Sequence, residues 1–359
     1  MRLSFHWRLI QGGEKFDMTM ARQVALRAAG LPDFEAQADF CREAERCGIE
    51  SLLVDISFAK PDPITLSTAL GLSTDNIHFM VAARSGLLSP TFFVQQINTF
   101  SALTSGRVCL NVVAGHSPEE QKYYGDFLAH DERYARTEEF LAICHAFWAQ
   151  SGAVNFHGKY YRVEEGKLNT PFVSPARASP KIFIGGNSNA ARDLAIRQGS
   201  CWMRLCDTPE KVREQGRPVL AAGKEVGLRL SVIVGSTHAE AVGMAATLVR
   251  GIAPASQERA FLKEFTRRSD SESIKSTYEL AETEWLTPYL WTGAVRSHGA
   301  PAIALVGTPA EIATAIMEYR DAGVSQFILS GWPKREAMIS FGTTVLPLVR
   351  QLERERGDV

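Results

Sequence analysis

The chain has 359 residues, of which 45% are hydrophobic and 22% charged, with 39 Lys and Arg against 40 Asp and Glu. With a formal net charge of −1, the composition gives no indication of the basic face that binding to nucleic acid or to an anionic membrane requires. No apolar run is long enough to cross a bilayer, and we expect a cytoplasmic protein because the first residues enter a strand pattern without a signal peptide. The six cysteines form no CxxC pair and the eight histidines no ligand cluster, so we expect reduced thiols and no metal site.

Apolar runs of strand length alternate with helical patterns along the chain. The predicted strands are residues 2–9, 51–55, 77–83, 108–113, 181–185, 201–205, 229–234 and 326–329. Helices are predicted over 32–48, 62–73, 90–103 and 131–149, and from about 187, 208, 238, 308 and 334. Asp62-Pro63 and Thr208-Pro209 place a capping side chain before a proline in the first turn, as is typical of a helix start.

The number of βα units predicts the fold class. Eight strands, each followed by a helical segment, and no GxGxxG motif after the first strand favour an α/β protein with a (β/α)8 TIM barrel over an open sheet. We expect one domain over residues 1–359, with insertions at about 11–31, 151–180 and 253–300. Long loops in a barrel most often cover its catalytic end, so we expect the insertions there.

Two neighbouring segments carry a family resemblance. They are Ser105-Gly-Arg-Val-Cys-Leu-Asn-Val-Val-Ala-Gly-His116, a buried strand that ends in a small-residue turn, and His130-Asp-Glu-Arg-Tyr134, which opens a helix. In this order the chain resembles the bacterial luciferase-like flavin-dependent monooxygenases, nearest the FMNH2-dependent alkanesulfonate monooxygenase branch. Further matching pieces occur in the same order at 83–90, 183–188, 228–230, 290–296, 304–307 and 327–333.

The glycine turn Gly185-Gly186-Asn187-Ser188 is a candidate phosphate site. A glycine turn before a helix exposes backbone N–H groups and the positive end of the helix dipole, and Ser188 adds a hydroxyl. The alternative is that Asn187 only caps the helix. The resemblance implies that Gly186, Asn187, Ser188 and Tyr134 hold the phosphate of FMN. A half-buried packing tyrosine is the alternative for Tyr134.

Other cofactor residues are expected at strand ends. Asn111 places an amide in an apolar strand, which is unfavourable unless the amide is paired, so a polar ligand would explain it. The resemblance also implies flavin contact for Asn111 and for Ala114, where relatives carry a hydroxyl residue. Arg84 ends the third strand. We expect it either to contact the flavin or the substrate, or to form a salt bridge at the rim of the barrel.

The resemblance implies a two-component reaction. Reduced FMN comes from a separate NAD(P)H-dependent flavin reductase and, with O2 as co-substrate, oxygenates a small organic molecule. The flavin supplies the difficult chemistry, so the missing catalytic triad is no argument against an enzyme.

Substrate residues are also implied by the resemblance. Sulfonate-specific relatives carry two arginines that match Arg229 and Arg296, and a guanidinium suits an oxyanion. Arginines that are solvated or paired with glutamates are the alternative. Ser231, Trp332, Ala59 and Gln11 stand where the branch has His, Tyr, Cys and His, so the substrate is a sulfonate, another organosulfur compound or another small molecule.

Three rival functions remain from the sequence. They are a deazaflavin-dependent hydride-transfer enzyme of the same fold, a non-catalytic flavin-binding barrel, and an unrelated eight-stranded barrel such as an aldolase. We also expect a homo-oligomer, a dimer or tetramer. Phe34, Phe40, Phe92 and Phe93 on early helices suit an interface, and core packing explains them equally well.

Overall fold

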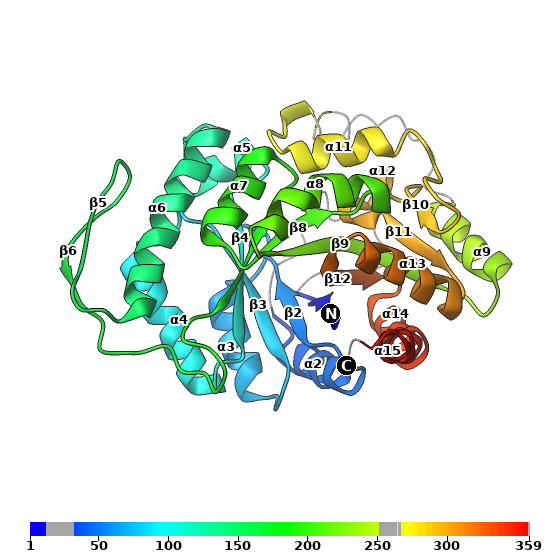
Figure 1. Cartoon of the computed structure of the whole chain (residues 1–359), viewed down its shortest axis with the longest axis horizontal. Helices are drawn as coiled ribbons and strands as arrows, with labels where there is room; N and C mark the ends of the chain where they lie inside the picture. Colours follow the sequence, from blue (N-terminus) through cyan, green and yellow to red (C-terminus); the bar gives the residue numbers. More distant parts are fainter. Residues whose placement is uncertain (12–31, 251–263, 265–266, 358–359) are drawn as a thin grey trace.

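Parallel strands close into a barrel in the computed structural model, which describes residues 1–11, 32–250, 264 and 267–357 (Figure 1). Each strand pairs with the next, and the last, β12, pairs with β1. The fold is therefore a (β/α)8 TIM barrel, and the eight predicted strands are the eight that close it. These are β1 (Ser4–Arg8), β2 (Ser51–Val54), β3 (His78–Ala83), β4 (Val108–Val113), β7 (Lys181–Gly185), β8 (Cys201–Leu205), β9 (Glu225–Val234) and β12 (Val324–Gly331).

Strand β9 is longer than predicted and has two neighbours along one edge. Its first half pairs with β8, and its second half, Ser231 to Val234, pairs with β11 (Ala304–Gly307). Strand β10 (Leu290–Trp291) extends this edge antiparallel to β11. The sequence did not predict β10 and β11 as strands, because runs this short carry little periodicity.

Helices surround the strands (Figure 1). Two predicted N-capping side chains are confirmed: Asp62 and Thr208 accept hydrogen bonds from the backbone N–H groups of Thr65 and Lys211, respectively. The outer helices are α2 (Phe34–Arg46), α3 (Pro63–Leu72), α4 (Pro90–Thr104), α6 (His130–Ala149), α7 (Asn189–Gln198), α8 (Pro209–Ala221), α9 (His238–Val249), α13 (Pro309–Asp321) and α14 (Lys334–Ser340). Short helices α5 (Pro118–Tyr123), α11 (Glu272–Leu280) and α12 (Val295–His298) lie in connecting segments.

The insertion at 151–180 packs beside α4 and α6 instead of lying wholly at the catalytic end, where we expected it. It contains an antiparallel hairpin, β5 (Val154–His157) with β6 (Arg162–Gly166), which projects beside α6 (Figure 1). Glu139 of α6 accepts hydrogen bonds from the backbone of residues 159–161, and Asn98 of α4 donates to Thr170 O. At the turn of the hairpin, Tyr161 Oη donates to Ser85 O, just after the C-terminal end of β3. A segment that follows a helix starts near the N-terminal ends of the strands, which explains why this insertion does not cover the catalytic end.

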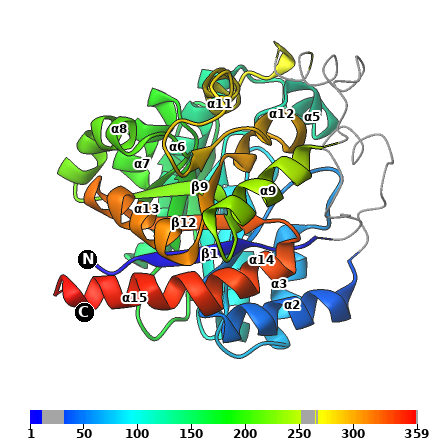
Figure 2. The ribbon, with the colours of Figure 1, turned by 90° about the vertical axis from the view of Figure 1, so that its right-hand side faces the viewer.

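The two ends of the described chain lie together. The last helix, α15 (Leu346–Glu355), runs along β1 (Figure 2). The fully buried Glu353 accepts a hydrogen bond from Leu3 N at 2.6 Å and pairs with Arg350 at 2.7 Å. This contact secures the first strand of the barrel.

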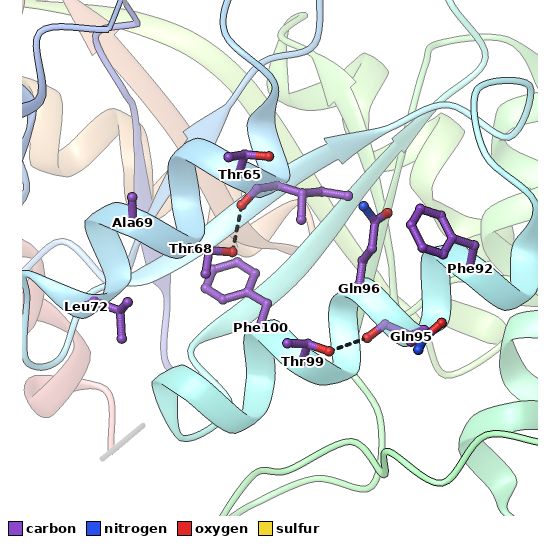
Figure 3. A pocket seen from close by; sticks show the side chains of 10 residues that line it. Thr65, Thr68, Ala69, Leu72, Phe92, Gln95, Gln96, Thr99 and Phe100 are labelled. Atoms are coloured by element: carbon purple, nitrogen blue, oxygen red, sulfur yellow. Dashed lines mark hydrogen bonds between the residues drawn. The ribbon is translucent and has the colours of Figure 1, made fainter.

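A groove of about 550 Å³ lies between α3 and α4 (Figure 3). Its lining side chains, which include Thr68, Phe92 and Phe100, come from these two helices and not from strand ends, so the groove is separate from the barrel mouth.

Of the four phenylalanines considered for an interface, Phe40 and Phe93 are core residues, whereas Phe34 and Phe92 are exposed. The homo-oligomer remains a prediction, with the exposed face of α4 as its candidate surface.

No helix in the described ranges is long and apolar enough to span a membrane. The same residues contain no group of three or more His, Cys, Asp or Glu side chains placed to hold a metal ion.

Candidate active site

The turn after β7 has a backbone that requires glycine. Gly186 has a φ of +143° and is held from both sides, since its N–H donates to Met203 O and its carbonyl accepts from Trp202 Nε1 at 2.7 Å. Ser188 then caps α7, where its hydroxyl accepts from Ala191 N. The turn thus faces the positive end of the α7 dipole, as an anion site requires.

Tyr134 lies against this turn. A Cβ added at Gly186 would come within 2.8 Å of Tyr134 Oη, so only a glycine allows this approach. Burial raises the pKa of the Tyr134 phenol, and the nearby Ser188 side chain opposes this effect, so the phenol stays protonated and can donate a hydrogen bond. The structure brings together the predicted phosphate-site residues Tyr134, Gly186 and Ser188.

Asn187 contacts a segment that is distant in sequence. Its backbone N–H donates to Ser273 Oγ at 2.7 Å, and its side-chain oxygen accepts from Leu205 N at 2.9 Å. Ser273 belongs to α11, in the third predicted insertion. The described part of that insertion therefore covers the glycine turn at the C-terminal end of β7.

Two neighbouring strands offer polar atoms that lack partners. Asn111 on β4 is 7% exposed, and within the described part of the chain its Oδ1 has no hydrogen-bond partner. A Cβ at Gly185 would lie 3.5 Å from that oxygen, so Asn111 points toward the turn. Arg84 pairs with Glu120 at 3.2 Å and donates to Ile56 O, but its Nε and Nη1 have no partner among the same residues. Buried polar atoms without a protein partner at adjacent strand ends are candidate contacts for a polar ligand.

Arg133 was not predicted and connects the site to the insertion. It is 2% exposed, donates from Nε to Ala114 O at 2.9 Å, and pairs with Asp270 at 2.6 Å. The predicted cofactor residue Ala114 is therefore held through its carbonyl. The sequence did not indicate that Arg133 is buried, because a charged residue in the first turn of an amphipathic helix is usually exposed.

His116 follows the small-residue turn after β4. Its carbonyl accepts from Ser269 Oγ at 2.8 Å. Burial lowers the pKa of its imidazole, Glu120 opposes this effect, and the charges of Arg84 and Arg229 add to it. His116 thus lies within electrostatic reach of both arginines.

Arg229 points from β9 to Asp55, the residue after β2, with Nη2 and Oδ1 at 3.6 Å. Arg8 and Lys60 bind the same carboxylate at 2.6 and 2.7 Å. Arg8, Asp55 and Lys60 were not predicted as site residues. A polar residue at the end of an apolar strand is the signal that could have found Arg8 and Asp55.

The remaining predicted residues have other contacts. Ser231 is fully buried, with its hydroxyl on Pro301 O and Ser330 Oγ. Trp332 is half-buried, and its ring lies 5.5 Å from that of His298. Arg296 is exposed on α12 and donates to carbonyls at the end of α11, those of Tyr278 and Ala281. These contacts place Arg296 at a helix C-terminus, whereas Arg229 lies in the barrel.

Comparison with known proteins identifies the family. The model for luciferase-like monooxygenases matches residues 16–326. The chain belongs to the luciferase-like monooxygenase family. This excludes an unrelated barrel such as an aldolase.

Solved structures with this fold include several enzymes. EDTA monooxygenase from Chelativorans sp. BNC1 is 23% identical, with a TM-score of 0.77 over 98% of this chain and 94% of that one. A riboflavin lyase, solved with modified FMN and riboflavin, is 19% identical, with a TM-score of 0.73 over 100% and 93%. An F420-dependent secondary alcohol dehydrogenase is 16% identical, with a TM-score of 0.67 over 98% and 100%. At these identities the likeness is one of fold.

Proposed function

We propose that this chain is the oxygenase of a two-component system that uses reduced FMN and O2 to oxygenate a small organic substrate. One observation carries the proposal. Gly186, Tyr134 and Ser188 form a candidate phosphate site. At adjacent strand ends, Asn111 and Arg84 have buried polar atoms without a hydrogen-bond partner among the described residues. Family membership and the FMN in the riboflavin lyase structure support it. A separate NAD(P)H-dependent flavin reductase would supply the reduced cofactor.

The residues present fit FMN. Tyr134, Ser188 and the N-terminus of α7 would bind the phosphate, and Asn111 Oδ1 would accept a hydrogen bond from the ring, whose imide carries an N–H. When bound, reduced FMN supplies the electrons and the reaction with dioxygen. The segment around Ser269, Asp270 and Ser273 would exclude water from this end of the barrel.

For the substrate, Arg229 is the better placed of the two predicted arginines. It is held at the barrel mouth by Asp55, while Arg296 caps α11. The Ser231 hydroxyl already bonds Pro301 O and Ser330. We therefore propose that the substrate is a sulfonate, another organosulfur compound or another small organic molecule. The site would act on it without the acid–base histidine of the alkanesulfonate branch. Trp332 remains a candidate wall of the substrate pocket.

The test is an anaerobic titration with reduced FMN, oxidised FMN and the deazaflavin F420, followed by rapid mixing with oxygenated buffer while absorbance is recorded. We expect saturable binding that is tightest for reduced FMN, and an absorbance transient before the oxidised spectrum appears. Preference for F420 would favour the hydride-transfer alternative, which the alcohol dehydrogenase structure keeps open. Tight binding of oxidised FMN, without any reaction on mixing with oxygen, would favour a non-catalytic flavin-binding barrel.

The variant Asn111→Leu tests the flavin site itself. The change replaces a buried amide, whose oxygen has no partner among the described residues, with an apolar side chain of similar size. The free energy of unfolding of the cofactor-free protein should therefore stay the same or rise by about 1 kcal/mol. The affinity for FMN should fall at least tenfold, or about 1.4 kcal/mol. The matched control is Asn155→Leu on the exposed hairpin, which should bind FMN normally. Unchanged FMN affinity in Asn111→Leu would remove Asn111 from the site.

A further inference from the structure

The N-termini of two helices meet at the glycine turn after β7. Ser188 caps α7, and Ser271 caps α11, which has Ser273 in its first turn. The two helix ends are joined by the hydrogen bond from Asn187 N to Ser273 Oγ, at 2.7 Å. Each helix N-terminus carries a partial positive charge of about half an elementary charge. Two such ends repel each other, so an anion bound beside both would stabilise their contact.

Ser273 has a hydroxyl that can serve a ligand. Its oxygen accepts the bond from Asn187 N, and in the described part of the chain no acceptor takes its own proton. The proton is therefore available to an anion that lies near the turn. Two other hydroxyls of this helix are used within it, since Ser276 and Thr277 donate to the Ser273 carbonyl at 3.4 and 2.8 Å. Ser273 is thus the residue through which α11 can contact a ligand at the turn.

Two groups on either side of this turn also indicate a ligand. Asn111 on β4 is 7% exposed, and its Oδ1 has no partner among the described residues. This oxygen lies 3.5 Å from the position of a Cβ at Gly185, so it faces the turn. Just before α11, Asp270 has a buried Oδ1 that likewise has no partner among those residues. A ligand with several polar groups would satisfy both atoms.

The first turn of α11 lies close to the Tyr134 phenol. Burial raises the pKa of this phenol most, and the charges of Glu272 and Asp270 raise it further. Asp270 is paired with Arg133 at 2.6 Å, which compensates its charge. Glu272 is exposed, so solvent screens its charge. The start of α11 therefore lies beside a predicted phosphate-site residue, and its acidic residues do not prevent an anion from binding there.

We propose that the phosphate of FMN binds between the N-termini of α7 and α11, and that Ser273 donates a hydrogen bond to it. Ser273 then joins Tyr134 and Ser188 as a phosphate-binding residue, and it comes from the third insertion rather than from a barrel strand or its helix. The phosphate in turn holds α11 against the barrel, since ligand binding and the ordering of a segment are linked reciprocally. The inference rests on the proposed function, because it names FMN as the source of the phosphate.

The test compares reduced FMN with reduced riboflavin, which has the same ring and ribityl chain but no phosphate, in anaerobic titrations. We expect the unaltered protein to bind FMN at least tenfold more tightly than riboflavin. Hydrogen exchange in residues 269–280 should slow when FMN is bound, and should slow much less at equal occupancy by riboflavin. Equal protection of residues 269–280 by the two flavins would overturn the inference.

The variant Ser273→Ala isolates the new contact. Its affinity for reduced FMN should fall about tenfold, as expected for the loss of a hydrogen bond to a charged group. Its affinity for reduced riboflavin should stay unchanged, which also shows that the variant is folded. The matched control is Ser276→Ala, about one turn later on α11, which should leave both affinities unchanged. Unchanged FMN affinity in Ser273→Ala, or equal losses for the two flavins or in the two variants, would contradict the inference.

The inference and the proposed function fail in distinguishable ways. Binding of FMN and riboflavin with equal affinity would leave the flavin site standing and overturn the role of α11. If neither flavin binds, inorganic phosphate is the remaining probe. Saturable phosphate binding that slows exchange in residues 269–280, and that is lost in Ser273→Ala, would leave the anion site standing without the flavin. Absence of binding for both flavins and for phosphate would overturn both proposals.

Discussion

Gly186 shows how one residue sets the geometry of the candidate flavin site. Its φ of +143° lies in a region that other residues rarely adopt, and its missing side chain leaves room for the Tyr134 hydroxyl. The same atoms would hold a phosphate if the proposed function is correct. A change at this position therefore acts on backbone strain and on the binding site together.

We predict that Gly186→Ala weakens FMN binding at least tenfold and destabilises the protein by roughly 1–3 kcal/mol. The new Cβ would lie 2.8 Å from Tyr134 Oη and 2.9 Å from Ala191 Cβ, so one of them must move. Fluorescence titration with FMN and denaturant unfolding measure the two effects. The matched control is Gly223→Ala after α8, where φ is +70° and no atom would lie within 4 Å of the Cβ. It should lose stability but keep its FMN affinity; normal FMN binding by Gly186→Ala would count against the cradle.

At the scale of elements, α11 and the residues before it cover the end of β7 through a few polar contacts. Ser269 bonds His116 O, Asp270 pairs with the buried Arg133, and Ser273 accepts from Asn187 N. The Asp270 side chain is 25% exposed, so this ion pair is partly shielded from solvent. Removing one partner of such a pair leaves a buried charge without its counter-ion, which is more unfavourable than breaking an ion pair at the surface.

We predict that Asp270→Asn loosens this segment without unfolding the barrel. Loss of one partner leaves Arg133 buried with a weaker acceptor, so hydrogen exchange should speed up in residues 269–280 and not in β4 or β7. FMN affinity should fall several-fold if the segment covers the cofactor. The matched control is Glu132→Gln, which removes a carboxylate from the exposed pair with Lys159 on the same helix as Arg133. Equal exchange in both variants would show that the Arg133 pair does not hold the segment.

At the scale of the whole molecule, a buried polar network lies at the N-terminal end of the barrel. His6 contacts Gln326 Oε1 at 2.9 Å and Ser51 Oγ at 2.7 Å, and Gln326 continues to Glu225. Burial lowers the pKa of His6 to about 4. The imidazole is therefore neutral in the folded barrel over most of the pH range in which the unfolded chain would protonate it.

We predict that the free energy of unfolding falls by about 2 kcal/mol between pH 7.5 and pH 5 through His6 alone. The unfolded chain binds the proton below pH 6.5 and the folded chain only near pH 4, so stability rises with pH in this window. Asp55 adds nothing there, because its lowered pKa affects stability only below about pH 4. Urea unfolding at both pH values should show a smaller difference for His6→Gln, with the remainder arising from groups such as His78 and His116. An unchanged difference would mean that His6 is not buried in its neutral form.

The sequence by itself determined the eight barrel strands and most helix starts, since alternation, capping residues and glycine turns act over a few neighbouring residues. Order and resemblance also singled out Gly186, Ser188 and Tyr134 as candidate phosphate-site residues, and the fold brings these residues together. Only the tertiary structure decided that Arg8, Lys60 and Arg229 meet at Asp55, that Arg296 caps a helix, and that the hairpin lies outside the barrel. Those contacts join residues tens to hundreds of positions apart, and their distances depend on how the barrel closes rather than on any local pattern.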